Sequence, residues 1–152
     1  MPESAPLARK ALAFVVRREP EQKPTLLVYQ HLDSPELPWR LPGGGLHADE
    51  SPEAGLLREL REEVGDYLFQ IVRKLGIQRY YKHFTSRNVE RHDFLVRAGP
   101  MPNHFVHQDR DPDVQVEEFM RFQWLGMDSL DLIDDEHQGV LIPSYVPEWF
   151  QQ

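Results

Sequence analysis

Cysteine is absent from the 152 residues, which excludes disulfide bridges, thiolate zinc sites and a cysteine nucleophile. Long hydrophobic runs are absent as well. The best apolar run near the N-terminus, residues 11–16, is too short for a signal-peptide core followed by a cleavage site, and far too short to span a membrane. The sequence also has no Asn-x-Ser/Thr glycosylation motif. We therefore expect a cytoplasmic protein with no membrane partner.

Positive charge is scarce. The chain has 17 Lys and Arg against 25 Asp and Glu, which gives a formal net charge of −8. This balance argues against long nucleic acid as a partner, because phosphate backbones are bound by clustered Lys and Arg. The basic residues gather between positions 71 and 99, and the acidic ones between 109 and 136. The length suits a single domain over residues 1–152, with residues 1–8 and 144–152 expected as peripheral tails.

Apolar and β-branched segments predict strands, separated by segments rich in proline and glycine. The expected strands are 11–17, 25–30, 78–84, 92–97 and 119–125. Residues 31–45 contain three prolines and three consecutive glycines, so we expect a loop there. With two helices, this order suits an α/β (α+β) fold in which helices cover a mixed sheet.

The clearest helix is expected at residues 51–64. Ser51 suits its N-cap, Pro52 its first position and Gly65 the residue after its end. Apolar residues recur at steps of three and four, which predicts one buried face. A second helix is expected at residues 128–140, limited by a glycine and a proline.

Three carboxylates crowd one face of the first helix. Spacings of three and four residues place Glu59 beside Glu62 and Glu63, where like charges repel. Arg58 can pair with Glu62, but one arginine does not neutralise three carboxylates. A hard divalent cation such as Mg²⁺ would, and it prefers oxygen ligands. The preceding glycines at 43–45 let backbone groups approach a metal or phosphate closely, although a triple glycine alone is more often a turn.

From Gly44 to Asp66 the chain reads GGLHADESPEAGLLRELREEVGD. This segment resembles the signature of the Nudix hydrolase family, G-x5-E-x7-R-E-U-x-E-E-x-G-U, where U is bulky and aliphatic. The one departure is Asp66 at the last U position, and the following Tyr67 and Leu68 offer replacement packing. The resemblance extends over most of residues 9–142, although only the signature is specific. It implies an α/β/α sandwich with a mixed central sheet.

The resemblance also implies roles for individual residues. Glu59, Glu62 and Glu63 match the family's carboxylate ligands for Mg²⁺ or Mn²⁺, and Glu59 also matches the group that orients or deprotonates the attacking water. The carbonyl of Gly43 matches a backbone metal ligand. The catalytic set is then Glu59, Glu62 and Arg58.

Two further positions match residues that support such a site. Glu50 and Gly44 are expected to brace it, with Glu50 pairing with Arg58 or with a ligand glutamate. A further acid often joins from outside the signature, and Glu118 is the choice here, with Glu117 as its neighbouring substitute. Both acids can equally face solvent.

The segment from Asp109 to Asp113 also bears comparison with a calcium-binding loop. Its alternating acids fit the first three ligand positions of that loop. Val114 stands at the required glycine and Met120 at the required glutamate, so we reject calcium binding there.

Substrate contacts are expected after the signature. Family members that act on diadenosine polyphosphates tend to carry a tyrosine for base stacking in this region, which suggests Tyr80 or Tyr81. Lys82, His83 and Arg91 are candidate phosphate contacts. Each of these residues can equally serve packing or face solvent.

The resemblance implies a pyrophosphohydrolase that cleaves a nucleoside diphosphate linked to another group, by attack of water at phosphorus. The substrate stays open among diadenosine polyphosphates, (deoxy)nucleoside triphosphates and nucleotide sugars. One alternative is a nucleotide-binding or regulatory module without catalysis, and another is an interaction domain whose acidic helix only faces solvent. A homodimer is common in the family and is not readable from this sequence.

Overall fold

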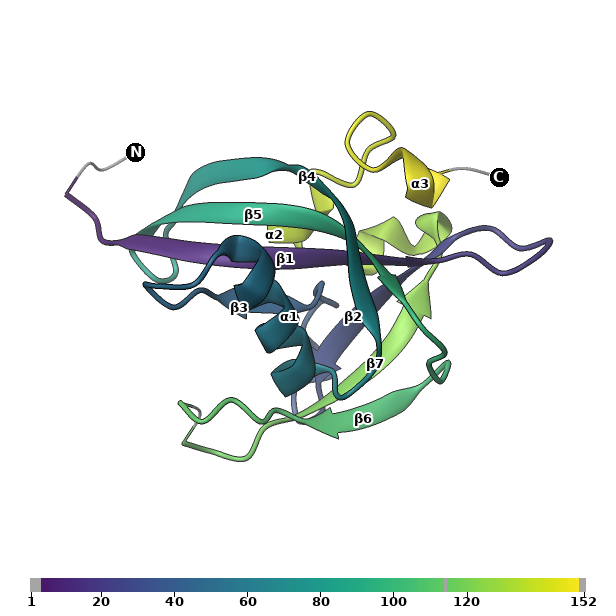
Figure 1. Ribbon diagram of the computed structural model, residues 1–152, viewed down its shortest axis with the longest axis horizontal. Coiled ribbons are helices and arrows are strands. Elements are labelled where there is room, and N and C mark those ends of the chain that lie inside the picture. Colours follow the sequence, from purple (N-terminus) through teal and green to yellow (C-terminus); the bar gives the residue numbers. More distant parts are fainter. Residues whose placement is uncertain (1–3, 114, 151–152) are drawn as a thin grey trace.

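The computed structural model describes every residue except 1–3, 114 and 151–152. The described chain forms a seven-stranded sheet with helical segments packed around it (Figure 1). The strands are β1 Leu7–Arg17, β2 Thr25–His31, β3 Gly43–Gly45, β4 Phe69–Lys82, β5 Arg87–Ala98, β6 Phe105–Gln108 and β7 Phe119–Leu125. The helical segments are α1 Pro52–Glu63, the 3₁₀ helix η1 Met127–Leu132, α2 Asp135–Gln138 and α3 Pro147–Phe150.

Strand β1 lies in the middle of the sheet, whose order is β4-β5-β1-β2-β7-β6, with β3 also paired to β1. Among the pairs of named strands in the described chain, only β1–β5 is parallel, and it runs from Leu7 opposite Asn88 to Val15 opposite Val96. Parallel neighbours cannot be joined by a tight turn, so the chain between them must cross over. That crossover carries α1 across the sheet beside β3 (Figure 1).

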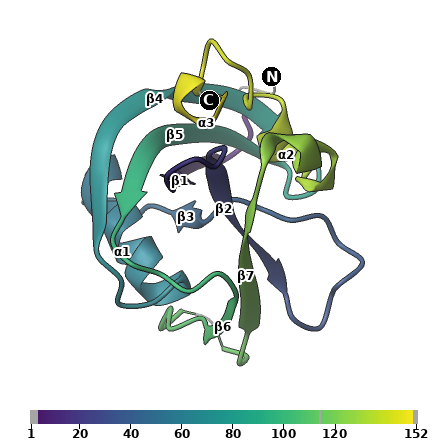
Figure 2. The same cartoon turned by 90° about the vertical axis from the view of Figure 1, so that its right-hand side faces the viewer.

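Two hydrophobic cores lie on opposite faces of β1, because successive side chains of a strand point to opposite sides. Ala11, Ala13 and Val15 pack in a core that includes Leu56, Leu60 and Val64 of the α1 region. Leu12 and Phe14 join the second core, which contains Ile133, Leu141 and Trp149 from the C-terminal part of the chain. Figure 2 shows α1 and the pair α2 and α3 on different sides of the sheet. The expected mixed sheet covered by helices is confirmed.

The first predicted helix is confirmed with its caps. Ser51 has extended backbone angles, and its hydroxyl accepts a hydrogen bond from the N–H of Ala54 at 3.2 Å. The chain leaves α1 through Gly65, whose φ of +123° is a conformation that side-chain-bearing residues rarely adopt.

The strand predictions are confirmed in position, but β1, β4 and β5 begin earlier than expected, and two strands were not predicted. β4 starts at Phe69 instead of residue 78 and ends at Lys82 instead of residue 84, β5 runs from Arg87 to Ala98 instead of 92–97, and β6 was not expected. β3 lies inside the predicted loop 31–45, where Gly43 pairs with Leu12 and Gly45 with Lys10. A side chain at Gly43 would meet the carbonyl oxygen of Ala11 at 2.3 Å, which explains why glycine permits this close pairing.

The predicted single helix at 128–140 is wrong. The chain forms η1, becomes extended at Ile133 and starts again as α2. Ile133 is buried and forms a strand-like bridge with Trp39, while the N–H of Asp134 donates to the carbonyl of Trp39. Asp134 then caps α2 by accepting the N–H of Glu136 at 2.8 Å. Pairing with a distant loop therefore overrides the local helical pattern.

The chain ends differ from the expected peripheral tails where the structure describes them. Leu7 and Ala8 already belong to β1 and pair with β5. At the other end, Val146 and Trp149 are fully buried in the second core. Apolar burial therefore ties the last helix to the body of the domain.

Candidate functional site

Three carboxylates from two separate parts of the chain converge at the end of the sheet near β3. Oxygen atoms of Glu59, Glu62 and Asp111 all lie within 4.8 Å of one another. The first two residues come from α1, and the third comes from the loop between β6 and β7. Glu59 is 8% exposed, so at least one of these charges is largely withdrawn from water. We refer to these three side chains as the carboxylate cluster.

Strand β3 consists of three glycines, and we refer to it as the glycine strand; it leaves room for the carboxylate of Glu59. A side chain at Gly44 would come within 2.5 Å of the Glu59 carboxylate, whereas one at Gly45 would meet nothing within 4 Å. The predicted support by Gly44 therefore has a steric basis: the carboxylate lies directly against the strand backbone.

Arg58 braces the cluster from the side. Its Nη1 donates to Glu59 and Glu62, each at 3.1 Å, and its Nη2 donates to the carbonyl of Gly45 at 2.9 Å. Its Nε donates to Glu50 at 3.0 Å, and a second bond joins the same two side chains. The hydrogen bonds from Arg58 hold the pKa of Glu50 at about 2. The expected pairing of Arg58 with Glu50 is thus present in the structure, together with contacts to two of the predicted ligands.

Burial raises the pKa of Glu59 to about 7, because the effect of Arg58 is smaller than the combined effect of desolvation and repulsion from Glu62 and Asp111. A cation at this position would remove that penalty. The donors are all carboxylate oxygens, which suits a hard divalent ion such as Mg²⁺ or Mn²⁺ better than a metal that prefers nitrogen or sulfur. The residues present therefore fit the metal that the sequence analysis expects.

The other predicted ligands lie in different surroundings. Glu63 is buried and accepts the N–H of Gly43 at 3.2 Å, and burial raises its pKa well above the usual value. Glu118 is half-exposed, and its carbonyl accepts the N–H of Asp109. Neither Glu63 nor Glu118 belongs to the group of close oxygens found among the described residues. The ligand roles of Gly43, Glu63 and Glu118 stay predictions.

Beside the cluster, a cleft made of two adjoining cavities runs along the sheet towards α2. The inner cavity, of about 180 Å³, has Gly43, Gly44, Lys10, Arg40 and Glu136 among its lining residues. The outer cavity, of about 750 Å³, shares Arg40 and Glu136 with it. Four of the predicted substrate residues line the outer cavity, namely Tyr80, Tyr81, Lys82 and His83.

Glu136 gathers polar groups at the junction of the two cavities. Its carboxylate accepts hydrogen bonds from Tyr80 at 2.6 Å, Lys82 at 2.8 Å and Arg40 at 3.0 Å. Burial alone would raise the pKa of Glu136, but these three bonds outweigh it and hold the pKa well below its usual range. Tyr81 lies further out, in edge-on contact with the ring of His83. The cleft thus presents cations next to aromatic rings.

Arg91, the fifth predicted substrate residue, lines the inner cavity but directs its donors to other protein groups. It forms two bonds to Asp93, at 2.8 and 3.1 Å, and its Nη1 donates to the carbonyl of Glu136. The pair is almost completely buried. In this arrangement Arg91 supports α2 and the floor of the cleft, and its contact with substrate stays a prediction.

Several residues of the site were not found from the sequence. Arg40 stands in the segment 31–45, where the sequence predicts only a loop, and Glu136 stands in the predicted helix 128–140, for which the sequence predicts no role. His137, for which the sequence predicts no role, is buried, accepts the N–H of Leu41 at 3.0 Å and has its pKa lowered well below the usual value by burial. Asp111 was considered only for a calcium loop. No local pattern marks these positions, because each acts across a long sequence separation.

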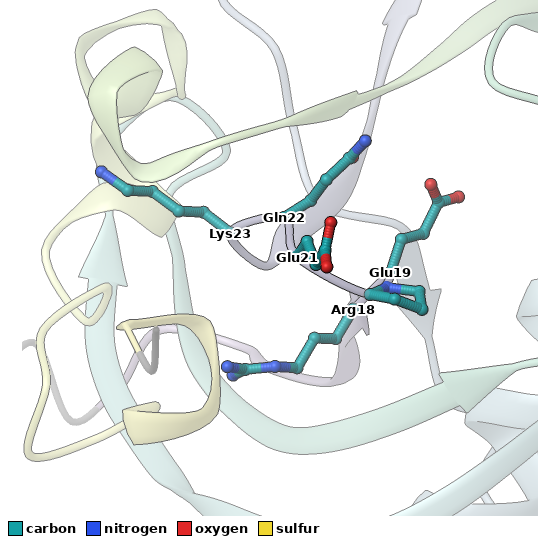
Figure 3. A pocket seen from close by; sticks show the side chains of 6 residues that line it. Arg18, Glu19, Glu21, Gln22 and Lys23 are labelled. Atoms are coloured by element: carbon teal, nitrogen blue, oxygen red, sulfur yellow. The ribbon is translucent and has the colours of Figure 1, made fainter.

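A different hollow, of about 660 Å³, lies in the connection between β1 and β2 and is lined by Arg18 to Lys23 (Figure 3). Its labelled side chains point away from one another, and the connection lies at the far end of the sheet from α1 (Figure 1). It therefore has no part in the carboxylate cluster. In the described part of the chain, no helix is long and apolar enough to cross a membrane.

Comparisons with known proteins agree with this arrangement. The RNA pyrophosphohydrolase of Gluconacetobacter diazotrophicus is 36% identical over 112 residues, which is 60% of this chain and 59% of that protein. The RNA pyrophosphohydrolase of Zymomonas mobilis is 58% identical over 33 residues, 22% of this chain and 21% of that protein. The chain thus spans less than two thirds of these curated relatives.

A solved structure of a NUDIX hydrolase from Nitrosomonas europaea has a TM-score of 0.63 at 16% identity, covering 94% of this chain and 88% of the other. At that identity the likeness concerns the fold. The family model of the NUDIX domain matches residues 7–145, which include β3, α1 and all three members of the carboxylate cluster. This chain therefore belongs to the Nudix family.

Proposed function

We propose that this protein is a metal-dependent pyrophosphohydrolase that cleaves a nucleoside diphosphate linked to another group. The observation that carries the proposal is the carboxylate cluster, in which oxygens of Glu59, Glu62 and Asp111 lie within 4.8 Å of one another. The cluster lies against the glycine strand and is braced by Arg58. Bound Mg²⁺ or Mn²⁺ would lower the pKa of its water and neutralise charge on phosphoryl oxygens.

The chain's own residues have distinct tasks in this proposal. Glu59 and Glu62 hold the metal, and Glu59 orients the attacking water or accepts its proton. Arg58 fixes both carboxylates through Nη1. Asp111 completes the set from the β6–β7 loop, a role for which Glu118 is the alternative. Gly43 and Glu63 remain proposed as ligands beside them.

The substrate is proposed to extend from the cluster along the cleft. Lys10, Arg40 and Lys82 offer positive charge for phosphates, and Tyr81 and His83 offer rings in the outer cavity. Diadenosine polyphosphates and (deoxy)nucleoside triphosphates fit this order of groups. The two curated relatives described above are named RNA pyrophosphohydrolases, so a triphosphorylated RNA 5′ end is a further candidate.

The test is product release from purified protein with Mg²⁺ or Mn²⁺, across dinucleoside polyphosphates, nucleoside triphosphates, nucleotide sugars and 5′-triphosphorylated RNA. Glu62→Gln should lower turnover by more than about 100-fold, because even residues that only orient metal ligands are worth about 10–100-fold. Arg73→Ala, in an exposed ion pair with Glu148, is the matched control and should behave as wild type. Undiminished turnover by Glu62→Gln would overturn the assignment of the cluster.

The alternative is a nucleotide-binding module without catalysis. Tight nucleotide binding with no turnover on any of the panel would favour it. The retained arrangement of Arg58, Glu59 and Glu62 argues for catalysis, since binding alone does not require carboxylates that repel one another.

A further inference from the structure

The position where the family signature is broken has a partner in the structure. The signature expects an aliphatic residue at Asp66, but this side chain is exposed and forms an ion pair with Arg110. Both carboxylate oxygens take part, with Nη1 at 3.1 Å and Nη2 at 3.0 Å. The expected replacement packing is provided in part by Tyr67, whose ring packs against Phe105, whereas Leu68 stays largely exposed.

Arg110 also closes the end of α1. Its main-chain N–H donates to the carbonyl of Glu62 at 2.9 Å, and its Nη2 donates to the carbonyl of Arg61 at 2.6 Å. The last carbonyls of a helix have no partner within the helix and need donors from elsewhere. A positively charged side chain is also favoured at this end of a helix. One residue of the β6–β7 loop therefore makes two contacts with the end of α1 and an ion pair with Asp66, just beyond that end.

The next residue along the chain is Asp111, the third member of the carboxylate cluster. The residue before Arg110 is Asp109, and its N–H donates to the carbonyl of Glu118 at 2.8 Å. The side chain of Asp109 in turn accepts the N–H of Asp111 at 2.9 Å. The chain is thus held immediately before Asp111, and the contacts of Arg110 determine how far Asp111 lies from α1.

We propose that Asp66 and Arg110 are positioning residues that hold Asp111 within reach of Glu59 and Glu62. The inference rests on the proposed function, because it concerns the metal site at that cluster. An exposed ion pair contributes little to overall stability. Its effect should therefore be seen in metal binding rather than in folding, and Asp66 replaces an aliphatic residue because it supplies an anchor for this loop.

The first test measures Mn²⁺ binding to metal-free protein by electron paramagnetic resonance of free Mn²⁺, without any substrate. Arg110→Ala should weaken binding about 10-fold, as expected for a residue that orients a metal ligand. Its melting temperature should stay close to that of wild type, because the main-chain bond to Glu62 remains. Arg73→Ala removes another exposed pair that is held by two hydrogen bonds, far from the cluster, and should not change Mn²⁺ affinity.

A double-mutant cycle separates positioning from a general effect. If Arg110 acts through Asp111, then Arg110→Ala should add nothing to the loss caused by Asp111→Asn. Asp66→Asn should give a smaller loss than Arg110→Ala, since the contacts of Arg110 with α1 remain. Full additivity of the two changes, or unchanged Mn²⁺ affinity in Arg110→Ala, would overturn the inference.

The same measurements distinguish this failure from failure of the proposed function. If the wild-type protein binds Mn²⁺ and turns over substrate, and Arg110→Ala binds the ion equally well, only the positioning role is refuted. If the wild-type protein neither binds Mn²⁺ nor hydrolyses any substrate of the panel, both the positioning role and the proposed function are refuted.

Discussion

A buried ion pair beside the cleft offers a quantitative test of how the site is supported. Arg91 and Asp93 are 2% and 0% exposed in their side chains, and their shortest contact is 2.8 Å. The hydroxyl of Tyr145 donates to the same carboxylate at 2.8 Å, while Arg91 also donates to the carbonyl of Glu136. The pair therefore connects β5 with the C-terminal segment and with the floor of the cleft.

Asp93→Asn should lower the free energy of unfolding by about 3–5 kcal/mol, because it leaves the Arg91 guanidinium buried without a counter-charge. The asparagine has nearly the same volume, so no cavity adds to this cost. For a chain of about 150–250 residues, 1 kcal/mol corresponds to about 2–4 °C in melting temperature. The expected decrease is therefore about 6–20 °C.

The measurement is urea unfolding at pH 7 together with calorimetry, and the control is Glu148→Gln. That change breaks an ion pair with Arg73 that has the same two-bond geometry but is 42% and 30% exposed. It should cost about 0–1 kcal/mol. Equally small losses of unfolding free energy in both variants would refute the reasoning. Burial raises the pKa of Asp93, while Arg91 opposes this effect. Such a result would mean that burial prevails and that the carboxyl of Asp93 is neutral.

Two further predictions concern the cluster and the cleft. Gly44→Ala should weaken Mn²⁺ binding by about 10-fold or more, because its methyl group would meet Glu59 at 2.5 Å, while Gly45→Ala should leave binding unchanged. The lowered pKa of Glu136 means that its ionised form stabilises the fold above the ordinary value of 4.5, and that this contribution is lost as the pH falls. Urea unfolding should therefore show a smaller difference between wild type and Glu136→Gln at pH 3 than at pH 7.

Either prediction can fail in a definite way. Equal Mn²⁺ affinity of the two glycine variants would show that Glu59 does not need the space at Gly44. A stability difference for Glu136→Gln that is the same at both pH values would show that the carboxylate charge is not what the three donors stabilise.

The sequence by itself determined the local parts of this protein. The helix at 52–63, its cap at Ser51 and its exit through Gly65 follow from short-range preferences that do not depend on the rest of the fold. The contact of Arg58 with Glu62 follows from a spacing of four residues along one helix, whereas the contact between Glu50 and Arg58 was implied by the family resemblance. The strands at 11–17 and 119–125 were predicted because an apolar, strand-favouring composition is a property of the segment itself.

Tertiary structure decided which distant residues complete the site. Asp111 reaches the cluster only because the β6–β7 loop is anchored on α1, and Arg40 and Glu136 meet only because the chain between 128 and 140 is broken at Ile133. That break is produced by a strand-like bridge to Trp39, nearly a hundred positions away. Interactions of this kind depend on packing of separate elements, for which no local pattern exists. Spacing along the chain thus placed the two carboxylates of α1 together, whereas only the tertiary structure brings a third carboxylate, that of Asp111, next to them.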